Sequence, residues 1–219
     1  MARIARVIAP GHPHHIVQRG NRRQPTFFKD EDYELYIELM AQWCIRYQVD
    51  IWAYCLMPNH IHLIAVPRDE TGLARAIGEA HRRYTRHVNV REKWRGHLWQ
   101  ERFFSNPMDE YYLLAAARYV EMNPVAAGLV KKPGDYQFSS ARAHLEGVDD
   151  ELVKVDPLLE MIEFWNDFLR LSTEEECMVL QKYNRTGRPL GNDTFIDTIE
   201  ASLGRTLRPQ KPGPKRREQ

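Results

Sequence analysis

Two histidines stand one residue apart at the start of an apolar run, in the stretch Tyr54-Cys-Leu-Met-Pro-Asn-His60-Ile-His62-Leu-Ile-Ala-Val66. In a β-strand, residues i and i+2 share a face, so His60 and His62 should point the same way while Ile61 points into the opposite layer. Two imidazoles on one face suit a divalent metal site. The alternative is that both histidines merely occupy the polar entrance of a strand.

A tyrosine and an asparagine stand four residues apart in a second stretch, Asp109-Glu-Tyr-Tyr-Leu-Leu-Ala-Ala-Ala-Arg-Tyr119-Val-Glu-Met-Asn123-Pro124. Acidic residues in its first turn and an Ala/Leu-rich body predict a helix, which should end near Asn123 because a residue before proline disfavours the helical region. Tyr119 and Asn123 then share one face, opposite a packing stripe made of Leu113, Leu114, Ala117 and Val120. A nucleophile and a third metal ligand could meet there. A core tyrosine beside a helix-capping asparagine is the alternative.

Four ordered strings carry a family resemblance: His15-Ile-Val-Gln-Arg-Gly-Asn21-Arg22-Arg23, Leu56-Met-Pro-Asn-His60-Ile-His62, Leu98-Trp-Gln-Glu-Arg-Phe103 and Arg118-Tyr119-Val-Glu-Met-Asn123-Pro-Val-Ala-Ala-Gly128-Leu-Val130. Over roughly residues 10–140 the chain resembles the HUH single-tyrosine transposases, named for a His-hydrophobic-His pair, and more closely the REP-associated tyrosine transposases. One departure is Ala126, where relatives usually carry arginine. That departure weakens the expectation of a phosphate contact just after the helix.

The resemblance implies a reaction and its residues. Tyr119 would attack a phosphodiester of single-stranded DNA, giving a 5′-phosphotyrosine link and a free 3′-hydroxyl, and a second 3′-hydroxyl would reverse the step. His60, His62 and the side-chain carbonyl of Asn123 would hold Mg²⁺ or Mn²⁺ at the scissile phosphate. The DNA partner would be a repetitive extragenic palindrome hairpin with a flanking single strand. The expected DNA contacts are Arg19, Asn21, Arg22, Arg23, Arg82, Arg83 and Arg86.

Several alternatives stay open. Tyr112 lies seven residues before Tyr119 on nearly the same helical face, so it is a rival nucleophile. Zinc is a rival metal, although neither Cys55 nor the group His12, His14 and His15 has a recognisable zinc spacing. The chain could be another HUH enzyme, such as a replication initiator or a relaxase. It could also be a domesticated, non-catalytic DNA-binding protein that regulates or organises palindromic repeats.

These residues need a scaffold, and the patterns predict strands over 14–19, 50–57, 60–66 and 97–104, with helices over 30–47, 73–90 and 109–123. Met57-Pro-Asn-His60 supplies turn residues, so the two central strands should form a hairpin. The order β-α-β-β-α-β, followed by another helix, predicts an α+β protein of the ferredoxin-like type. In the resemblance, the histidine strand is central and the tyrosine helix packs beside it.

We expect a catalytic domain over residues 1–140 and a helical, partly disordered and basic C-terminal extension over 141–219. Residues 156–171 have an amphipathic pattern, a short helix should follow Ser172, and another should run from Asn192 to Gly204. The Pro-rich end from Arg208 should be disordered when unbound. A formal net charge of +1 hides a basic stretch over 68–102 and an acidic one over 146–176, which should face away from DNA.

Composition fits this organisation. A chain of 219 residues with 43% hydrophobic content can bury one core and carry an extension. Three cysteines without metal-ligand spacing predict a reduced cytoplasmic setting without disulfides. The DNA partner that the resemblance implies would place the protein at the nucleoid. The sequence shows neither a signal h-region nor a run of about 18 apolar residues, so no membrane partner is expected. A monomer and a homodimer are both compatible with the sequence.

Overall fold

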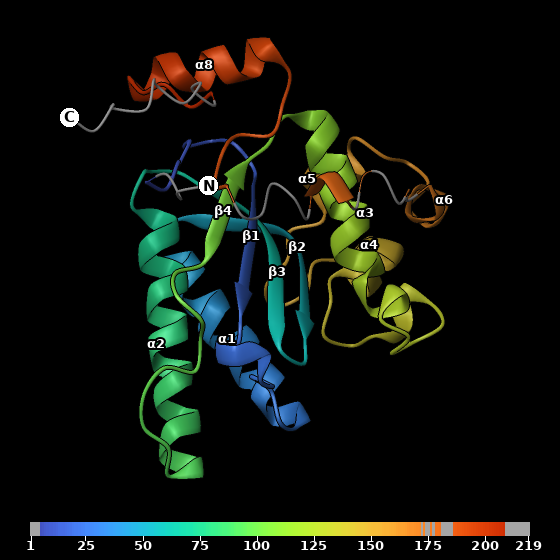
Figure 1. The fold of residues 1–219 in the computed structure, drawn as a ribbon. Coiled ribbons are helices and arrows are strands. Elements are labelled where there is room, and N and C mark those ends of the chain that lie inside the picture. The colour runs from blue at the N-terminus through green and yellow to red at the C-terminus, as the bar shows by residue number, and fades with distance from the viewer. Residues whose placement is uncertain (1–4, 172, 174–175, 177, 181–185, 209–219) are drawn as a thin grey trace, which may run out of the picture.

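Four strands form one antiparallel sheet in the computed structural model, which describes residues 5–171, 173, 176, 178–180 and 186–208. The strands β1 (His14–Arg19), β2 (Val49–Met57), β3 (His60–Pro67) and β4 (Phe104–Pro107) lie in the order β2-β3-β1-β4. Helix α1 (Asp30–Arg46) connects β1 to β2, and α2 (Gly72–Glu92) connects β3 to β4 (Figure 1). This is the ferredoxin-like order, so the predicted fold class is confirmed.

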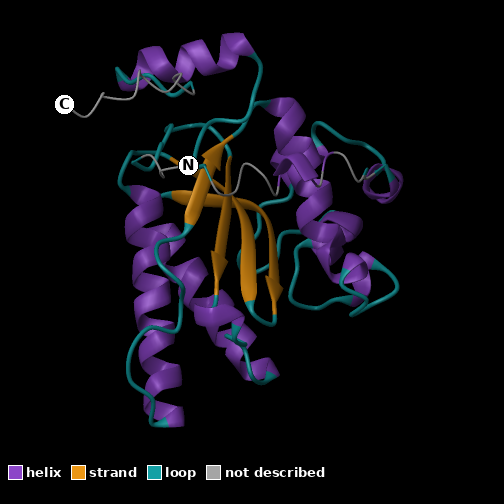
Figure 2. Ribbon diagram, viewed as in Figure 1, coloured by secondary structure: helices purple, strands orange, loops and turns teal. Residues whose placement is uncertain are grey.

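Helices cover both faces of the sheet (Figure 2). Helices α1 and α2 pack on one face, where Ile16 and Ile61 belong to the same buried cluster as Met40 and Ile77. On the other face α3 (Glu110–Ala126) packs against β2 and β3, and Val120 shares a second cluster with Ile64. The alternation along β3 therefore sends Ile61 toward α1 and α2, and its neighbours His60 and His62 toward α3.

The histidine hairpin forms as predicted. β2 and β3 pair antiparallel with Met57 opposite His60 and Cys55 opposite His62, and only Pro58 and Asn59 lie between the strands. β3 also pairs with β1, which places Val17 opposite His62. The histidines thus lie on a strand that is hydrogen-bonded on both sides, which is a rigid support for a site.

The fourth strand begins later than predicted. β4 covers Phe104–Pro107 rather than 97–104, and the earlier segment contributes an isolated bridge between Trp99 and Gly20. Glu101 has a φ of 54°, in the left-handed region, and this turn separates the bridge from β4. Trp99 and Phe103 belong to the core beneath α1 and α2. The apolar pattern over 97–104 therefore comes from a loop whose side chains are buried in the core, and not from a strand.

Helix α3 continues one turn past its predicted end. It runs to Ala126 with the buried Pro124 inside its last turn, and Gly128 follows with a φ of 70°. A proline cannot donate the helical hydrogen bond to the carbonyl four residues earlier, so one bond of the ladder is lost at Pro124 while the helix continues beyond it. The hydrogen bond from Ala127 N to Asn123 O is present at 2.9 Å. Asn123 is consequently a helical residue and not the cap of this helix.

The C-terminal extension forms the short helices α4 (Ala141–Glu146), α5 (Asp156–Leu159), α6 (Trp165–Arg170) and the longer α8 (Asp193–Leu203). The amphipathic pattern over 156–171 is thus two helices, because the break lets Leu158 and Trp165 both reach the α3 cluster. The helix expected after Ser172 and the expected disorder of the Pro-rich end concern segments that lie largely outside the described residues. The domain boundary at 140 stays a prediction.

Segments that follow α3 also contact both edges of the sheet. Ser139 forms a bridge to Cys55 on β2, and Leu190 forms one to Met108 beside β4. The backbone amide of Leu190 donates to Pro107 O at 2.8 Å, and Asp109 N donates back to Leu190 O at 2.9 Å. Within the described residues, these contacts occupy part of the backbone edge at β2 and at the end of β4.

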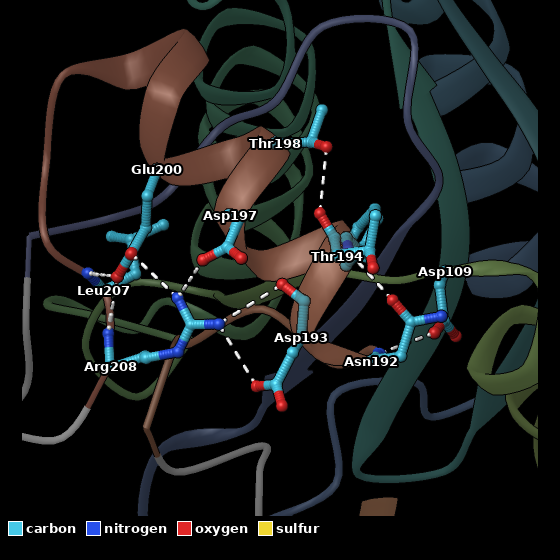
Figure 3. Close-up of polar contacts among 10 residues, drawn as sticks. Asp109, Asn192, Asp193, Thr194, Asp197, Thr198, Glu200, Leu207 and Arg208 are labelled. Carbon is cyan, nitrogen blue, oxygen red and sulfur yellow. Dashed lines mark hydrogen bonds and ion pairs between the residues drawn. The ribbon is translucent and has the colours of Figure 1, made fainter.

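Helix α8 is held at both ends by side chains (Figure 3). The side chain of its N-cap, Asn192, accepts a hydrogen bond from Phe195 N at 2.9 Å, as the predicted start near this residue requires. Arg208 donates to Asp197 at 2.6 Å and to Glu200 at 3.0 Å, which folds the following segment back onto the helix. Within the described part of the chain, no helix has the length and apolar character to cross a bilayer.

Candidate active site

The histidine pair meets the tyrosine helix on the α3 face of the sheet. The rings of His60 and His62 lie 5.0 Å apart, centroid to centroid, and His62 is only 2% exposed. The Tyr119 ring packs edge-on against His62 with centroids 5.3 Å apart and an interplanar angle of 86°. Residues separated by nearly sixty positions in the sequence therefore converge, and Tyr119 remains half-buried rather than fully enclosed.

Asn123 lies one helical turn beyond Tyr119. Its Nδ2 donates to Tyr119 O at 3.0 Å, which directs the amide nitrogen to the helix backbone and leaves the amide oxygen on the other side. That oxygen is the atom a metal would use. The rival Tyr112 is half-buried near the N-terminus of α3, and its ring packs against that of Tyr111 with centroids 5.3 Å apart.

Asn59 fixes the protonation of His60. Its Nδ2 donates to Arg23 O at 3.2 Å, so its Oδ1 faces His60 Nδ1 at 2.6 Å and accepts the proton there. The lone pair of His60 is then on Nε2, as a metal ligand requires. Burial, followed by the positive charge of Arg19, lowers the pKa of His60 to about 4, so the ring is neutral at pH 7. The sequence motif contains Asn59 but gives no sign of this role.

His15 orients the second histidine. His15 Nε2 lies 3.0 Å from His62 Nδ1, and the two rings are stacked with centroids 5.3 Å apart. Burial, followed by the charges of His60, His15 and Arg19, keeps the pKa of His62 well below its usual value. His62 Nε2 is buried and has no hydrogen-bond partner. A proton on His62 Nδ1, donated to His15, leaves a lone pair on that orphaned Nε2, which fits a metal ligand.

Arg19 ends β1 opposite His60 in the strand register. Its pKa is lowered mainly by burial and then by repulsion from Arg23, while attraction to the Tyr119 phenolate opposes the shift. Arg19 is thus close enough to Tyr119 to interact with its charge. It was predicted as a DNA contact, which stays a prediction, and the structure places it, half-buried, opposite His60 and near Tyr119.

The other predicted DNA contacts lie on two exposed surfaces. Asn21, Arg22 and Arg23 form the short helix η1 (Asn21–Arg23), which follows β1 directly. On α2, Glu79 binds Arg82 at 2.6 Å and Arg83 at 3.7 Å, so these two cations are partly neutralised. A groove of about 530 Å³ along the same helix is lined by Arg82, Arg83, Arg86, His87, Val90 and Arg91.

A buried carboxylate anchors the tyrosine helix to the extension. Glu121 is fully buried two residues after Tyr119 and accepts hydrogen bonds from Ser140 Oγ at 2.6 Å and Trp165 Nε1 at 2.8 Å. His144 Nδ1 lies 2.7 Å from the same carboxylate. Ser140 precedes α4, His144 lies within α4 and Trp165 begins α6. Glu121 therefore fixes the helix that carries Tyr119 against both of these helices. Nothing in the local sequence pattern signals this network.

We expect Glu121→Ala to lower the free energy of unfolding by about 3 kcal/mol or more, because three buried donors lose their acceptor. Glu121→Gln should cost less, since its amide oxygen can still accept. Urea denaturation of both variants checks this. Asp167→Ala, which removes an exposed carboxylate 3.7 Å from Arg170, is the matched control and should change stability by less than about 0.5 kcal/mol. If Glu121→Ala lowered the free energy of unfolding no more than Asp167→Ala does, the anchoring role of Glu121 would be contradicted.

A family model described as "Transposase IS200 like" matches residues 10–123, just over half of the chain. The chain belongs to the IS200-like transposase family. The matched range contains both histidines, Tyr119 and Asn123, and the family predicted from the sequence is confirmed. Within the described residues, no group of three or more His, Cys, Asp and Glu side chains is placed to hold a metal ion, so these residue types form no closed zinc site there.

Two relatives of this IS200-like transposase are of the REP-associated type. A Haemophilus influenzae protein that carries the name REP-associated tyrosine transposase is 30% identical over 110 residues, and the match covers 45% of this chain and 62% of the relative. The chain thus matches somewhat less than two thirds of that relative's length. A solved structure of a REP-associated tyrosine transposase bound to a REP hairpin shares the fold with a TM-score of 0.57 at 21% identity. The similarity covers 69% of this chain and 90% of that structure.

Proposed function

We propose that this protein cleaves and rejoins single-stranded DNA at repetitive extragenic palindrome hairpins through a covalent link to Tyr119. The observation that carries the proposal is the edge-on contact of Tyr119 with His62, beside His60, on the α3 face of the sheet. A nucleophile and two imidazoles on one face match the chemistry of phosphodiester transfer. The hairpin substrate is proposed because the structural neighbour is bound to a REP hairpin.

The nucleophilic step is a transesterification. The Tyr119 oxygen attacks the phosphorus, the bond from phosphorus to the 3′-oxygen breaks, and the departing 3′-oxygen takes a proton. A protonated phenol is a weak nucleophile, and the nearby positive charge of Arg19 favours the phenolate. The resulting 5′-phosphotyrosine keeps the energy of the ester bond. A 3′-hydroxyl of a second strand can therefore attack the same phosphorus and release Tyr119, which rejoins DNA without an outside energy source.

We propose His60 Nε2, His62 Nε2 and Asn123 Oδ1 as ligands of Mg²⁺ or Mn²⁺. The two neutral imidazoles and the amide oxygen leave coordination positions open, which allows Mn²⁺ as well as Mg²⁺, whereas a structural zinc site would need four closed ligands. When bound, the cation would neutralise charge that develops on the scissile phosphate. Asn59 and His15 would keep the two imidazoles in the tautomers that ligation requires.

The exposed arginines supply the sequence-independent part of DNA binding. We propose that Asn21, Arg22 and Arg23 of η1 contact the DNA near the scissile phosphate, since η1 follows Arg19 directly. Arg82, Arg83 and Arg86 would contact phosphates of the hairpin stem, and their partial pairing with Glu79 should weaken that contribution. The setting would be the cytoplasm, at the nucleoid, with the protein acting as a monomer or a homodimer.

The proposal is tested by incubating the full chain with Mg²⁺ or Mn²⁺ and a hairpin oligonucleotide that carries a single-stranded flank. We expect an adduct that survives denaturation and retains a label on the 3′ side of the cleaved bond, because a 5′-phosphotyrosine keeps that fragment. The fragment with the free 3′-hydroxyl should be released. Hairpin binding without an adduct, across a library of genomic hairpins, would support a non-catalytic DNA-binding protein instead.

A further inference from the structure

A pocket of about 600 Å³ lies beside η1 and opposite the end of α2. This volume is in the range of pockets that hold small organic ligands. Its lining, which belongs entirely to the described chain, combines aromatic rings, amides and cations and contains no carboxylate. The residues that matter most are Asn21, Arg22, Phe28, Asn89, Trp94 and Arg95.

Two large rings are exposed in this pocket. Trp94 is 48% exposed and Phe28 is 42% exposed, and the rings meet edge to face with centroids 5.6 Å apart. They come from different parts of the chain, one after α2 and one before α1. Exposed aromatic rings are costly in water, and a protein that keeps a pair of them in a pocket presents a flat apolar surface to a ligand.

The backbone at both rings is fixed by hydrogen bonds. Phe28 N donates to the buried carboxylate of Asp32 at 2.8 Å, and Arg91 forms an ion pair with that carboxylate. Burial alone would raise the pKa of Asp32, but the hydrogen bonds from Arg91 and Phe28 lower it overall, so the carboxylate stays charged. Trp94 N donates to Asn89 O at 2.8 Å. The backbone that carries both rings is therefore fixed before any ligand arrives, which reduces the entropy cost of binding.

One cation of the pocket, Arg22, lies on a strained turn together with its neighbour Arg23. Arg22 and Arg23 have φ values of 54° and 61°, a left-handed conformation that is unfavourable for residues other than glycine. A left-handed conformation at two successive residues persists only where the surrounding structure stabilises it, and such strained backbone is most frequent at functional sites. Here the turn is held by Asn59 Nδ2, which donates to Arg23 O at 3.2 Å. The result is a pair of exposed arginine side chains beside the aromatic pocket.

Asn59 also connects this pocket to the proposed metal site. The side chain that holds the Arg23 carbonyl accepts the Nδ1 proton of His60 at 2.6 Å. In addition, Gly20 N donates to Asn59 O, and Asn21 N donates to Leu98 O in the loop below Trp94, each at 2.8 Å. One set of hydrogen bonds thus fixes the histidine ligand and the pocket wall together, so both face the same end of the sheet.

We propose that this pocket binds one unpaired base of the single-stranded flank, with the base stacked on Trp94 and its phosphate held by Arg22 and Arg95. Every base has a flat π-face, and stacking on an aromatic side chain is the usual way in which proteins hold unstacked bases. The polar Asn21 and Asn89 line the same space and can reach base edges. The inference rests on the proposed function, since it requires a single-stranded DNA substrate.

The test measures affinity by fluorescence anisotropy for two probes, a hairpin with a five-nucleotide flank and the same hairpin with a blunt end. We expect Trp94→Ala to weaken binding of the flanked hairpin about tenfold and to leave the blunt hairpin unchanged, because one stacked base is lost. Trp94→Phe should keep most of the affinity. Phe164→Ala, which removes a 68% exposed ring far along the chain in the extension, is the matched control and should bind both probes normally.

An abasic scan through the flank identifies the base. The wild type should lose affinity at one position, and Trp94→Ala should show no further loss at that position. Equal affinity of the wild type for flanked and blunt hairpins, or an abasic profile of Trp94→Ala that matches that of the wild type, would overturn the proposal that this pocket binds a base. The adduct assay remains independent: an adduct without a Trp94 effect defeats this inference alone. A Trp94-dependent flank preference without any adduct defeats the proposed cleavage and leaves the pocket in place.

Discussion

Replacing Tyr119 with phenylalanine is expected to abolish the covalent protein–DNA adduct and to leave hairpin affinity unchanged. The substitution removes the attacking oxygen and nothing else, so the ring can keep its edge-on contacts with His62 at 5.3 Å and with His15 at 6.0 Å. The loss should exceed about a thousandfold, because no other group can replace a covalent nucleophile held in this position. A denaturing gel measures the adduct, and anisotropy on the same preparation measures binding.

Tyr112→Phe is the matched control for this experiment. Tyr112 lies on the same helix, is also half-buried and is removed from the histidine rings by two helical turns. Its phenylalanine variant should form the adduct at the wild-type rate. An adduct that persists in Tyr119→Phe and vanishes in Tyr112→Phe would refute the assignment of the nucleophile. Equal melting temperatures of the two variants would exclude unfolding as a cause.

Replacing His60 and His62 together with alanine is expected to stop cleavage while hairpin binding persists. Binding through the exposed arginines is electrostatic and does not require the metal. In the wild type, EDTA should also stop cleavage, and added Mn²⁺ should restore it. In the double variant Mn²⁺ should have no effect, because the ligands themselves are absent. Asn123→Ala should weaken the dependence on metal concentration and retain the nucleophile.

The burial of His62 requires a second variant. His62 is 2% exposed and bonded to His15, so its removal should itself lower the free energy of unfolding by about 2 kcal/mol. His60 is half-buried, and His60→Ala should stop cleavage with little change in melting temperature. His12→Ala, outside the site, is the control for losing a histidine as such. If His60→Ala lost hairpin binding and folding together, the pair would be a stability site rather than a metal site.

The fold was predictable because its signals are local. The strands β1, β2 and β3 follow from runs of alternating or continuous apolar residues, and the hairpin follows from Pro58 and Asn59 between them. The misplaced β4 had the same kind of signal, since Leu98, Trp99 and Phe103 are indeed buried. What the pattern could not show is that a left-handed Glu101 interrupts the segment and that its apolar side chains fill the core from a loop.

The candidate site was predictable in part. The face shared by His60 and His62 follows from strand periodicity, and the face shared by Tyr119 and Asn123 follows from helical periodicity. The family resemblance supplied the proposal that these faces belong to one site. The supporting residues were not predictable, because Asn59, His15 and Glu121 act through contacts with partners that are 36, 47 and 44 residues away in the chain.

By itself the sequence determined the elements, their order, the orientation of the two histidines along a strand and the pairing of Tyr119 with Asn123 along a helix. Each of these depends on repeats of two or 3.6 residues, which are properties of neighbouring positions. Only the tertiary structure decided that Tyr119 meets His62, that Arg19 belongs to the site, and that Trp94 and Phe28 share a pocket. Those contacts depend on how helices pack on the two faces of the sheet, and packing joins residues whose separation in the chain carries no periodic signal.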